Sequence, residues 1–283
     1  MTDATELPPL EERWLEWHGA RLRYYVGGAG SGAGPSLVLV HGLGGAASNW
    51  CELVPLLAPR FRLLVVDLPG HGGSSPLPSA PTLSPFADAV FRVAESEELL
   101  PVAVVGHSLG GLVALRLALR RPQAVRALVL AAAAGISSAS RIRETLVTLL
   151  VLMRPARLVA PHRRLIARVG WLRYPVLGYW QVSDPPALSP RAVEGFLAGP
   201  ALHTDIVDAG RALVAADPRT ELDRVHCPTF VLWGARDHMV PIEDGFDYAR
   251  RLRAPLRVIP DCGHLLIGER SDVCADAIAS FLK

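Results

Sequence analysis

Residues 104–111 read VVGHSLGG, and this short stretch decides the fold. An apolar run at residues 102–105 leads into it, and a run of good helix formers at residues 112–119 follows it. A serine flanked by two glycines in this setting predicts a sharp turn from a buried strand into a helix. Such a turn lifts the hydroxyl of Ser108 clear of the sheet, so Ser108 is a candidate nucleophile.

Short apolar runs alternate with helical patterns on both sides of this turn. The predicted strands are residues 37–40, 63–66, 102–105, 127–130, 229–233 and 256–259. The predicted helices are residues 49–57, 85–100, 112–119, 244–252 and 272–281, and residues 13–17 and 21–26 read as a β-hairpin. Continuous apolar strands between helices predict an α/β fold with a mostly parallel central sheet and helices on both faces.

The segment from residue 135 to residue 215 departs from this alternation. Its apolar residues recur with helical spacing and are interrupted by prolines, which predicts a set of short helices inserted as a cap. The chain is thereby divided into a core, residues 1–134 and 216–283, and a cap, residues 135–215. Residues 136–200 hold nine arginines against three acidic residues, so the cap is basic as well as apolar.

Composition limits the classes of function. Half of the 283 residues are hydrophobic and the formal net charge is +2, without a long basic run, so we expect a large core and no nucleic-acid partner. The four cysteines lack metal-ligand spacing, and no metal site is expected. No apolar segment approaches the roughly 18 residues that a bilayer-spanning helix needs. The acidic N-terminal residues lack a secretory pattern, so we expect a cytoplasmic protein.

The sequence HGLGG, residues 41–45, follows the predicted strand at residues 37–40. A glycine-rich turn there allows backbone N–H groups to face the serine. The N–H groups of Leu43 and Leu109 are the candidate donors to a developing oxyanion. We expect His41 to fix this loop rather than to take part in catalysis.

The sequence GARDHMVP, residues 234–241, supplies the candidate acid, Asp237. An aspartate that emerges just past a strand can hold an imidazole in the tautomer that a general base requires. Three other aspartates are alternatives, but Asp237 is preferred because it lies just past the strand at residues 229–233 and before the helix that follows. The alternatives are Asp217, Asp244 and Asp261.

The sequence PDCGHLLIGE, residues 260–269, supplies the candidate general base, His264. This histidine follows the last predicted strand and lies after both the serine and the acid in the chain. The resulting order, Ser108, Asp237, His264, is the order of the triad in α/β-hydrolases.

Together with DLPGHGGSS, residues 67–75, these segments resemble the α/β-hydrolase family over nearly the whole chain. The resemblance is to the branch with a helical cap, which includes serine esterases and lipases. It implies that Ser108 is the nucleophile, Asp237 the acid and His264 the base, and that the two leucines above are the oxyanion donors. It implies no metal and no organic cofactor.

The predicted function is that of a serine hydrolase that cleaves a medium-sized, lipophilic carboxylic ester through an acyl-enzyme on Ser108. Epoxide hydrolases and haloalkane dehalogenases would carry an aspartate in that place. Hydroxynitrile lyases of this fold use an active-site lysine, and the chain's one lysine is Lys283. A carbon–carbon bond hydrolase, a cofactor-free haloperoxidase (perhydrolase) and an acyltransferase would use the same triad and stay open. A non-catalytic ligand receptor or a scaffold that recruits partners is a further alternative.

The cap narrows the expected substrate. Its apolar residues at 146–153, and Trp171, Tyr174, Tyr179 and Trp180, could roof an apolar substrate pocket, or could pack the cap onto the core. Its arginines could meet an anionic lipid surface or an acidic substrate, or form a solvated face. The sequence does not determine the oligomeric state.

Overall fold

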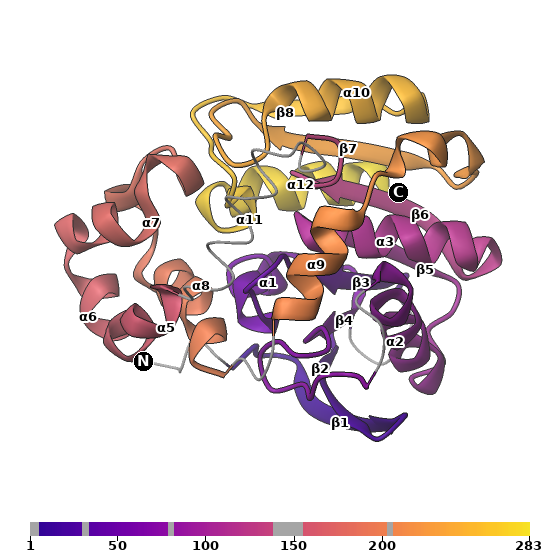
Figure 1. Ribbon diagram of the computed structural model, residues 1–283, viewed down its shortest axis with the longest axis horizontal. Helices are drawn as coiled ribbons and strands as arrows, with labels where there is room; N and C mark the ends of the chain where they lie inside the picture. The colour runs from indigo at the N-terminus through magenta and orange to yellow at the C-terminus, as the bar shows by residue number, and fades with distance from the viewer. Residues whose placement is uncertain (1–5, 30–33, 79–81, 138–154, 203–205) are drawn as a thin grey trace.

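The structure is a computed structural model that describes residues 6–29, 34–78, 82–137, 155–202 and 206–283 (Figure 1). An eight-stranded sheet forms its centre, in the order β1-β2-β4-β3-β5-β6-β7-β8. The strands are β1 (Glu11–Trp17), β2 (Ala20–Gly27), β3 (Ser36–Val40), β4 (Arg62–Val66), β5 (Val102–His107), β6 (Val125–Ala131), β7 (Thr229–Gly234) and β8 (Leu256–Ile259). β1 and β2 are antiparallel to their neighbours and the other strands are parallel, which confirms the expected mostly parallel sheet.

The central strands are buried because their sequences are almost wholly apolar. All six residues of β5 are buried, and four of the five residues of β3 are buried. Parallel strands covered on both faces need continuous apolar sequence of this kind. Val40 pairs with Gly106, so the carboxyl ends of β3 and β5 lie side by side.

The strand order creates a switch point between β3 and β5. From β3 the chain proceeds to β4 on one side and later returns to β5 on the other side. Loops that leave neighbouring strands in opposite directions leave a crevice at the carboxyl ends of the strands, where ligands bind in open α/β sheets. The loop after β3 and the turn after β5 therefore meet at this edge of the sheet.

Helices pack against this sheet. In Figure 1, α9 crosses the near side of the sheet and α12 lies behind it. The helices of the core are α1 (Val54–Leu57), α2 (Leu83–Ser96), α3 (Leu109–Arg120), α10 (Ile242–Leu252), α11 (Leu266–Glu269) and α12 (Ser271–Phe281). No helix within the described residues is long and apolar enough to cross a membrane.

The single helix predicted over residues 49–57 is wrong. The chain instead forms a 3-10 helix, η2 (Ala47–Trp50), followed by the short α1. Asn49 accepts a hydrogen bond from the N–H of Ala46, which caps η2 locally, and Pro55 has no N–H with which to continue a helix from the preceding turn. α11 was not predicted, since four residues are too few to give a periodic pattern.

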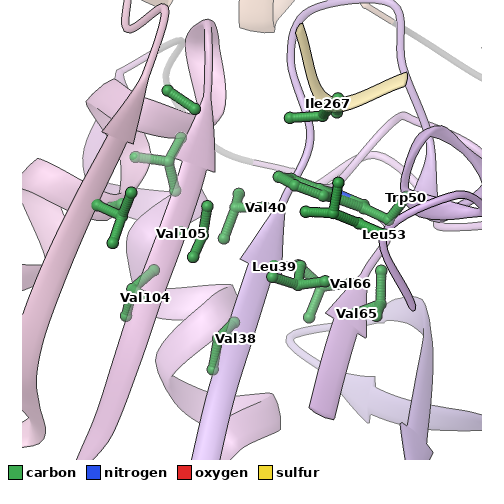
Figure 2. Packing of buried hydrophobic residues seen from close by; sticks show 14 of the residues in the cluster. Val38, Leu39, Val40, Trp50, Leu53, Val65, Val66, Val104, Val105 and Ile267 are labelled. Carbon is green, nitrogen blue, oxygen red and sulfur yellow. The ribbon is translucent and has the colours of Figure 1, made fainter. Parts of the chain in front are cut away.

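Figure 2 shows how η2 and α1 cover the sheet at this end. The side chains of Trp50 and Leu53 lie between the strands and Ile267, near Val40 and Val66. Trp50, Leu53 and Ile267 are completely buried. This apolar cluster fixes the position of the loop that follows β3.

The segment predicted as a cap is helical where the structure describes it. Its helices are α5 (Pro155–Val159), α6 (Arg163–Arg168), α7 (Arg173–Gln181), α8 (Pro190–Leu202) and α9 (Val207–Ala215). α5, α6 and α7 form a lobe to one side of the sheet, whereas α9 lies over the core near α2 (Figure 1). The apolar residues 146–153, expected to help roof the pocket, lie outside the described residues.

A buried arginine holds this lobe together. The guanidinium of Arg173, at the start of α7, donates hydrogen bonds to the backbone carbonyl oxygens of Pro186 (2.7 Å) and Ala167. Burial lowers the pKa of Arg173, and backbone carbonyls satisfy its N–H groups in place of water. The lobe therefore has an internal framework of its own.

Candidate active site

Ser108 lies on a strained turn between β5 and α3. Its backbone angles are φ 53° and ψ −118°, and a positive φ costs a non-glycine residue about 1–3 kcal/mol. The Ser108 N–H donates to the carbonyl oxygen of Ala131 (3.0 Å), and its own carbonyl oxygen accepts from the N–H of Ala134 (3.2 Å). These bonds to the end of β6 hold the turn in its strained form.

The two glycines of the turn are required by close packing. A Cβ on Gly106 would lie 2.2 Å from the carbonyl oxygen of Gly110. A Cβ on Gly110 would lie 2.2 Å from the carbonyl oxygen of Val40, at the end of β3. The turn therefore presses the start of α3 directly against the loop that carries the candidate oxyanion donors.

Asp237 and His264 form a buried, hydrogen-bonded pair. The Nδ1 atom of His264 lies 2.8 Å from Oδ2 of Asp237. The other carboxylate oxygen of Asp237 accepts from the N–H groups of Met239 (2.9 Å) and Val240 (2.8 Å), which fixes the carboxylate just past β7. A carboxylate can only accept from Nδ1–H, so the Nε2 atom of His264 is left with the lone pair that a general base needs.

The loop that carries His264 contacts the residue before Ser108. The Nε2–H of His107 donates to the carbonyl oxygen of His264 (2.9 Å), and the two imidazole rings have centroids 4.9 Å apart. Burial lowers the pKa of His107 to about 3, so its ring is neutral and serves as a structural donor. The structure thus places the candidate base beside the turn of Ser108.

The hydroxyl of Ser108 has no hydrogen-bond partner among the residues that the structure describes. The direct bond from Ser108 to His264 therefore stays a prediction, whereas the bond from His264 to Asp237 is present. In enzymes without bound substrate, catalytic hydrogen bonds are often long and shorten only in the complex.

The three alternative aspartates are engaged elsewhere. Asp244 accepts from a backbone N–H at the end of the β6 loop. Asp217 binds Arg219 (2.8 Å), and Asp261 pairs with Arg236 (2.5 Å). Of the four candidate aspartates, Asp237 is thus the one that forms a hydrogen bond with His264.

The candidate oxyanion donors lie beside the turn. The N–H groups of Leu43 and Leu109 bind no acceptor within the described ranges. A Cβ on Gly42 would lie 3.0 Å from Cβ of Ser108, so the loop that carries Leu43 touches the nucleophile. Two unpaired N–H groups near one serine are what stabilisation of an oxyanion requires.

His41 fixes this loop, as expected. Its Nδ1–H donates to the carbonyl oxygen of Gly42 (2.8 Å), and its Nε2 accepts from the N–H of Leu68 (3.0 Å). The loop after β3 is in this way tied to the loop after β4, which begins the motif at residues 67–75.

The aspartate of that motif is a structural anchor. One oxygen of Asp67 accepts from the N–H of Ala47 (2.6 Å), and the other accepts from the N–H of Gly73 (2.8 Å) and pairs with Arg23 (2.7 Å). Asp67 therefore connects η2, β2 and its own loop behind the candidate oxyanion donors.

Sequence reasoning missed Glu269, which positions the loop of the candidate base. Its partly buried carboxylate accepts from the N–H of Gly263 (2.8 Å), next to His264, and from the N–H of Ser183 (2.9 Å). Burial raises the pKa of Glu269 above its usual value. The spacing of five residues from His264 within PDCGHLLIGE was the signal available, but only the fold shows what the carboxylate binds.

The end of α7 runs along the same loop. The N–H of Leu265 donates to the carbonyl oxygen of Gln181 (3.0 Å), and a Cβ on Gly263 would lie 2.8 Å from that oxygen. The end of α7 is therefore in direct contact with both neighbours of His264.

The four candidate substrate-binding residues lie on the lobe of α5–α7. All four side chains are exposed, and their contact with a substrate stays a prediction. They are Trp171, Tyr174, Tyr179 and Trp180. The described part of the chain contains no group of three or more His, Cys, Asp or Glu side chains that could hold a metal ion.

Comparison with known proteins identifies the family. The sequence profile of the family described as alpha/beta hydrolase fold matches residues 35–271. The chain is 32% identical to pimeloyl-acyl-carrier-protein methyl ester esterase of Chromobacterium violaceum, over 82% of this chain and 88% of that protein. It is also 32% identical to the magnesium-chelatase 30 kDa subunit of Rhodobacter capsulatus, over 92% of this chain and 89% of that protein.

A solved structure gives the same result. A hydrolase from Pseudomonas aeruginosa PA01 superimposes with a TM-score of 0.73 at 28% identity, and the match covers 98% of this chain and 99% of that one. The family profile, the relatives and the sheet with its strained serine turn agree. This chain belongs to the α/β-hydrolase family.

Proposed function

We propose that this protein is a serine hydrolase that cleaves a medium-sized, lipophilic carboxylic ester. The observation that carries the proposal is the 2.8 Å hydrogen bond between Asp237 and His264, on a loop that contacts the residue before Ser108. An ordered carboxylate–imidazole pair beside a serine on a strained turn is the arrangement that nucleophilic acyl transfer requires. The relative named as a methyl ester esterase supports ester cleavage.

The mechanism has two halves. His264 Nε2 takes the hydroxyl proton of Ser108 as the oxygen bonds to the ester carbonyl carbon, and the N–H groups of Leu43 and Leu109 stabilise the oxyanion. The intermediate collapses, the C–O bond to the alcohol breaks, and the alcohol leaves with the proton from His264. Water then attacks the acyl-enzyme in the same way and releases the carboxylic acid and free Ser108.

The experiment compares wild type, Ser108→Ala and Ser96→Ala on chromogenic esters of increasing acyl-chain length. Ser96 is an exposed serine on α2 and serves as the matched control. Ser108→Ala is expected to lower kcat by on the order of 10⁶-fold, the loss that removal of a catalytic serine causes. Ser96→Ala is expected to match wild type.

A fluorophosphonate probe tests the nucleophile without knowledge of the natural substrate. Mass mapping is expected to find the adduct on the peptide that contains Ser108, in wild type and in Ser96→Ala alike. Equal ester hydrolysis by wild type and Ser108→Ala, or an adduct on another residue, would refute the proposal. Labelling of Ser108 without cleavage of any ester in the series would favour the carbon–carbon hydrolase or acyltransferase alternatives.

A further inference from the structure

Large apolar side chains are exposed on the lobe of α5–α7. Eleven large hydrophobic side chains are exposed across the described residues, and six of them lie within residues 158–180. We call these six the cap surface. They are Leu158, Leu165, Trp171, Tyr174, Tyr179 and Trp180.

These side chains are strongly exposed although the same helices have a buried face. Leu158 is 77% exposed and Trp171 is 70% exposed. Ile166, Ala167 and Leu177, on α6 and α7, are buried and supply the packing that the lobe needs. A cluster of exposed large apolar residues, beyond those that pack a domain, marks a surface that binds a partner or a membrane.

The charge around the cap surface indicates whether it binds a second protein surface or a membrane. Within residues 155–184 four arginines are at least partly exposed and Arg173 is buried, whereas one acidic residue, Asp184, is exposed near Tyr174. Arg168 is exposed on α6, three residues from Leu165 and therefore on the same side of the helix. The exposed arginines outnumber this one acidic residue, so two such surfaces would repel each other. An anionic surface would attract them.

Tryptophan, tyrosine and arginine are the side chains that favour a lipid headgroup region. The rings of Trp and Tyr are apolar with one polar atom, and arginine extends its charge toward phosphates while its stem covers apolar surface. Helices as short as α5, α6 and α7 could lie in the interface but could not cross it.

We propose that the cap surface binds the headgroup region of an anionic lipid bilayer. The lobe extends to one side of the core, where the sheet does not cover it (Figure 1). Through Gln181 the end of α7 contacts the loop of His264, so a bound membrane would lie next to the candidate active site. The binding itself does not depend on the proposed hydrolase activity. A second consequence, that a lipophilic ester would reach the active site from the membrane, does rest on the proposed hydrolase activity.

The experiment measures co-sedimentation of the full chain with large vesicles. Vesicles of phosphatidylcholine with phosphatidylglycerol are compared with vesicles of phosphatidylcholine alone, at low and high salt. Strong binding is expected to the anionic vesicles at low salt and weak binding in the other cases, because salt screens the attraction.

Variants locate the binding surface. Trp171→Ala combined with Trp180→Ala is expected to lower the partition coefficient at least about tenfold, and Arg168→Gln about fivefold. The matched controls, Phe246→Ala and Arg250→Gln, remove an exposed aromatic ring and an exposed charge on α10, and are expected to leave binding unchanged. Circular dichroism and thermal unfolding establish that each variant is folded.

Other results would overturn the proposal. They are absence of binding to both kinds of vesicle, equal binding to both, or equal losses from the cap variants and the α10 controls. Sedimentation velocity tests for a dimer. If the chain forms a dimer and Trp171→Ala combined with Trp180→Ala dissociates it, the cap surface binds a second copy of the chain instead of a membrane. Ser108→Ala is expected to bind vesicles as wild type does. Vesicle binding without ester hydrolysis would therefore contradict the proposed function alone, and hydrolysis without vesicle binding would contradict this inference alone.

Discussion

Single residues around His264 have separate tasks. Asp237 sets the tautomer of the ring, and His107 holds the carbonyl oxygen of the same residue. Glu269 accepts the N–H of Gly263 and also that of Ser183, just after α7. Glu269 is therefore a positioning residue, because it acts on the base through the backbone and touches no reacting atom.

Removal of the Glu269 carboxylate should displace the candidate base. We expect Glu269→Ala to lower kcat about ten- to a hundredfold with little change in KM for a short ester, because a misplaced catalytic group slows the chemical step more than binding. Glu269→Gln keeps one acceptor oxygen and is expected to retain more activity than Glu269→Ala. Steady-state kinetics on an acetyl ester measures both parameters.

Glu243→Gln is the matched control, since Glu243 is an exposed carboxylate on α10, and wild-type kinetics are expected. A loss confined to thermal stability, with kcat unchanged in folded Glu269→Ala, would show that the residue has only a structural role.

At the scale of elements, the turn after β5 joins three parts of the fold. It brings the end of β3, the end of β6 and the start of α3 into contact through backbone atoms. Such contacts leave no room for a side chain, so the sequence requirement is for glycine itself and not for a small polar residue.

Gly110→Ala tests this close packing. Alanine normally stabilises a helix relative to glycine, but its Cβ would lie 2.2 Å from the carbonyl oxygen of Val40. We expect the free energy of unfolding to fall by about 3 kcal/mol, a cost typical of a severely overpacked site. Urea unfolding monitored by tryptophan fluorescence measures the change.

Gly170→Ala, in the cap lobe, is the control, because the nearest atom to its Cβ would be an ordinary 3.8 Å away. Its effect is expected to stay within about 0.5 kcal/mol. Similar effects of the two substitutions would show that the turn can relax around a side chain.

For the whole molecule, two buried neutral histidines link stability to pH. Burial lowers the pKa of His71 and of His107 to about 3, whereas a histidine in an unfolded chain has a pKa of about 6.5. Between these values the unfolded state binds more protons than the folded state. Stability is therefore fully present above about pH 6.5 and is lost as pH falls toward about 3.

His71→Asn should remove part of this loss. Each such histidine contributes at most one proton, or about 1.4 kcal/mol per pH unit, to the slope of unfolding free energy against pH. We expect His71→Asn to lower the slope by up to that amount between about pH 6 and about pH 4. Urea unfolding over this range, with the exposed His162→Asn as control, provides the measurement. Equal slopes for wild type and His71→Asn would contradict the conclusion that burial of His71 makes stability depend on pH.

The local sequence alone determined the strands, the serine turn and the candidate triad. Apolar runs are long enough to specify buried strands, and the two glycines around Ser108, between a strand pattern and a helix pattern, predict a tight turn. The choice of Asp237 and His264 used their places past strands and their order after Ser108, because parallel strands bring their carboxyl ends to one edge. The hydrogen bond between them agrees with that choice.

Only the tertiary structure decided the rest. The break between η2 and α1, the anchoring by Asp67 and the role of Glu269 depend on groups far apart in the sequence, whose meeting no local pattern encodes. The exposure of Trp171 and its neighbours was not predictable from the sequence for the same reason. Helical spacing indicates that the helices of this segment are amphipathic. Packing between elements determines which of their faces meets the core.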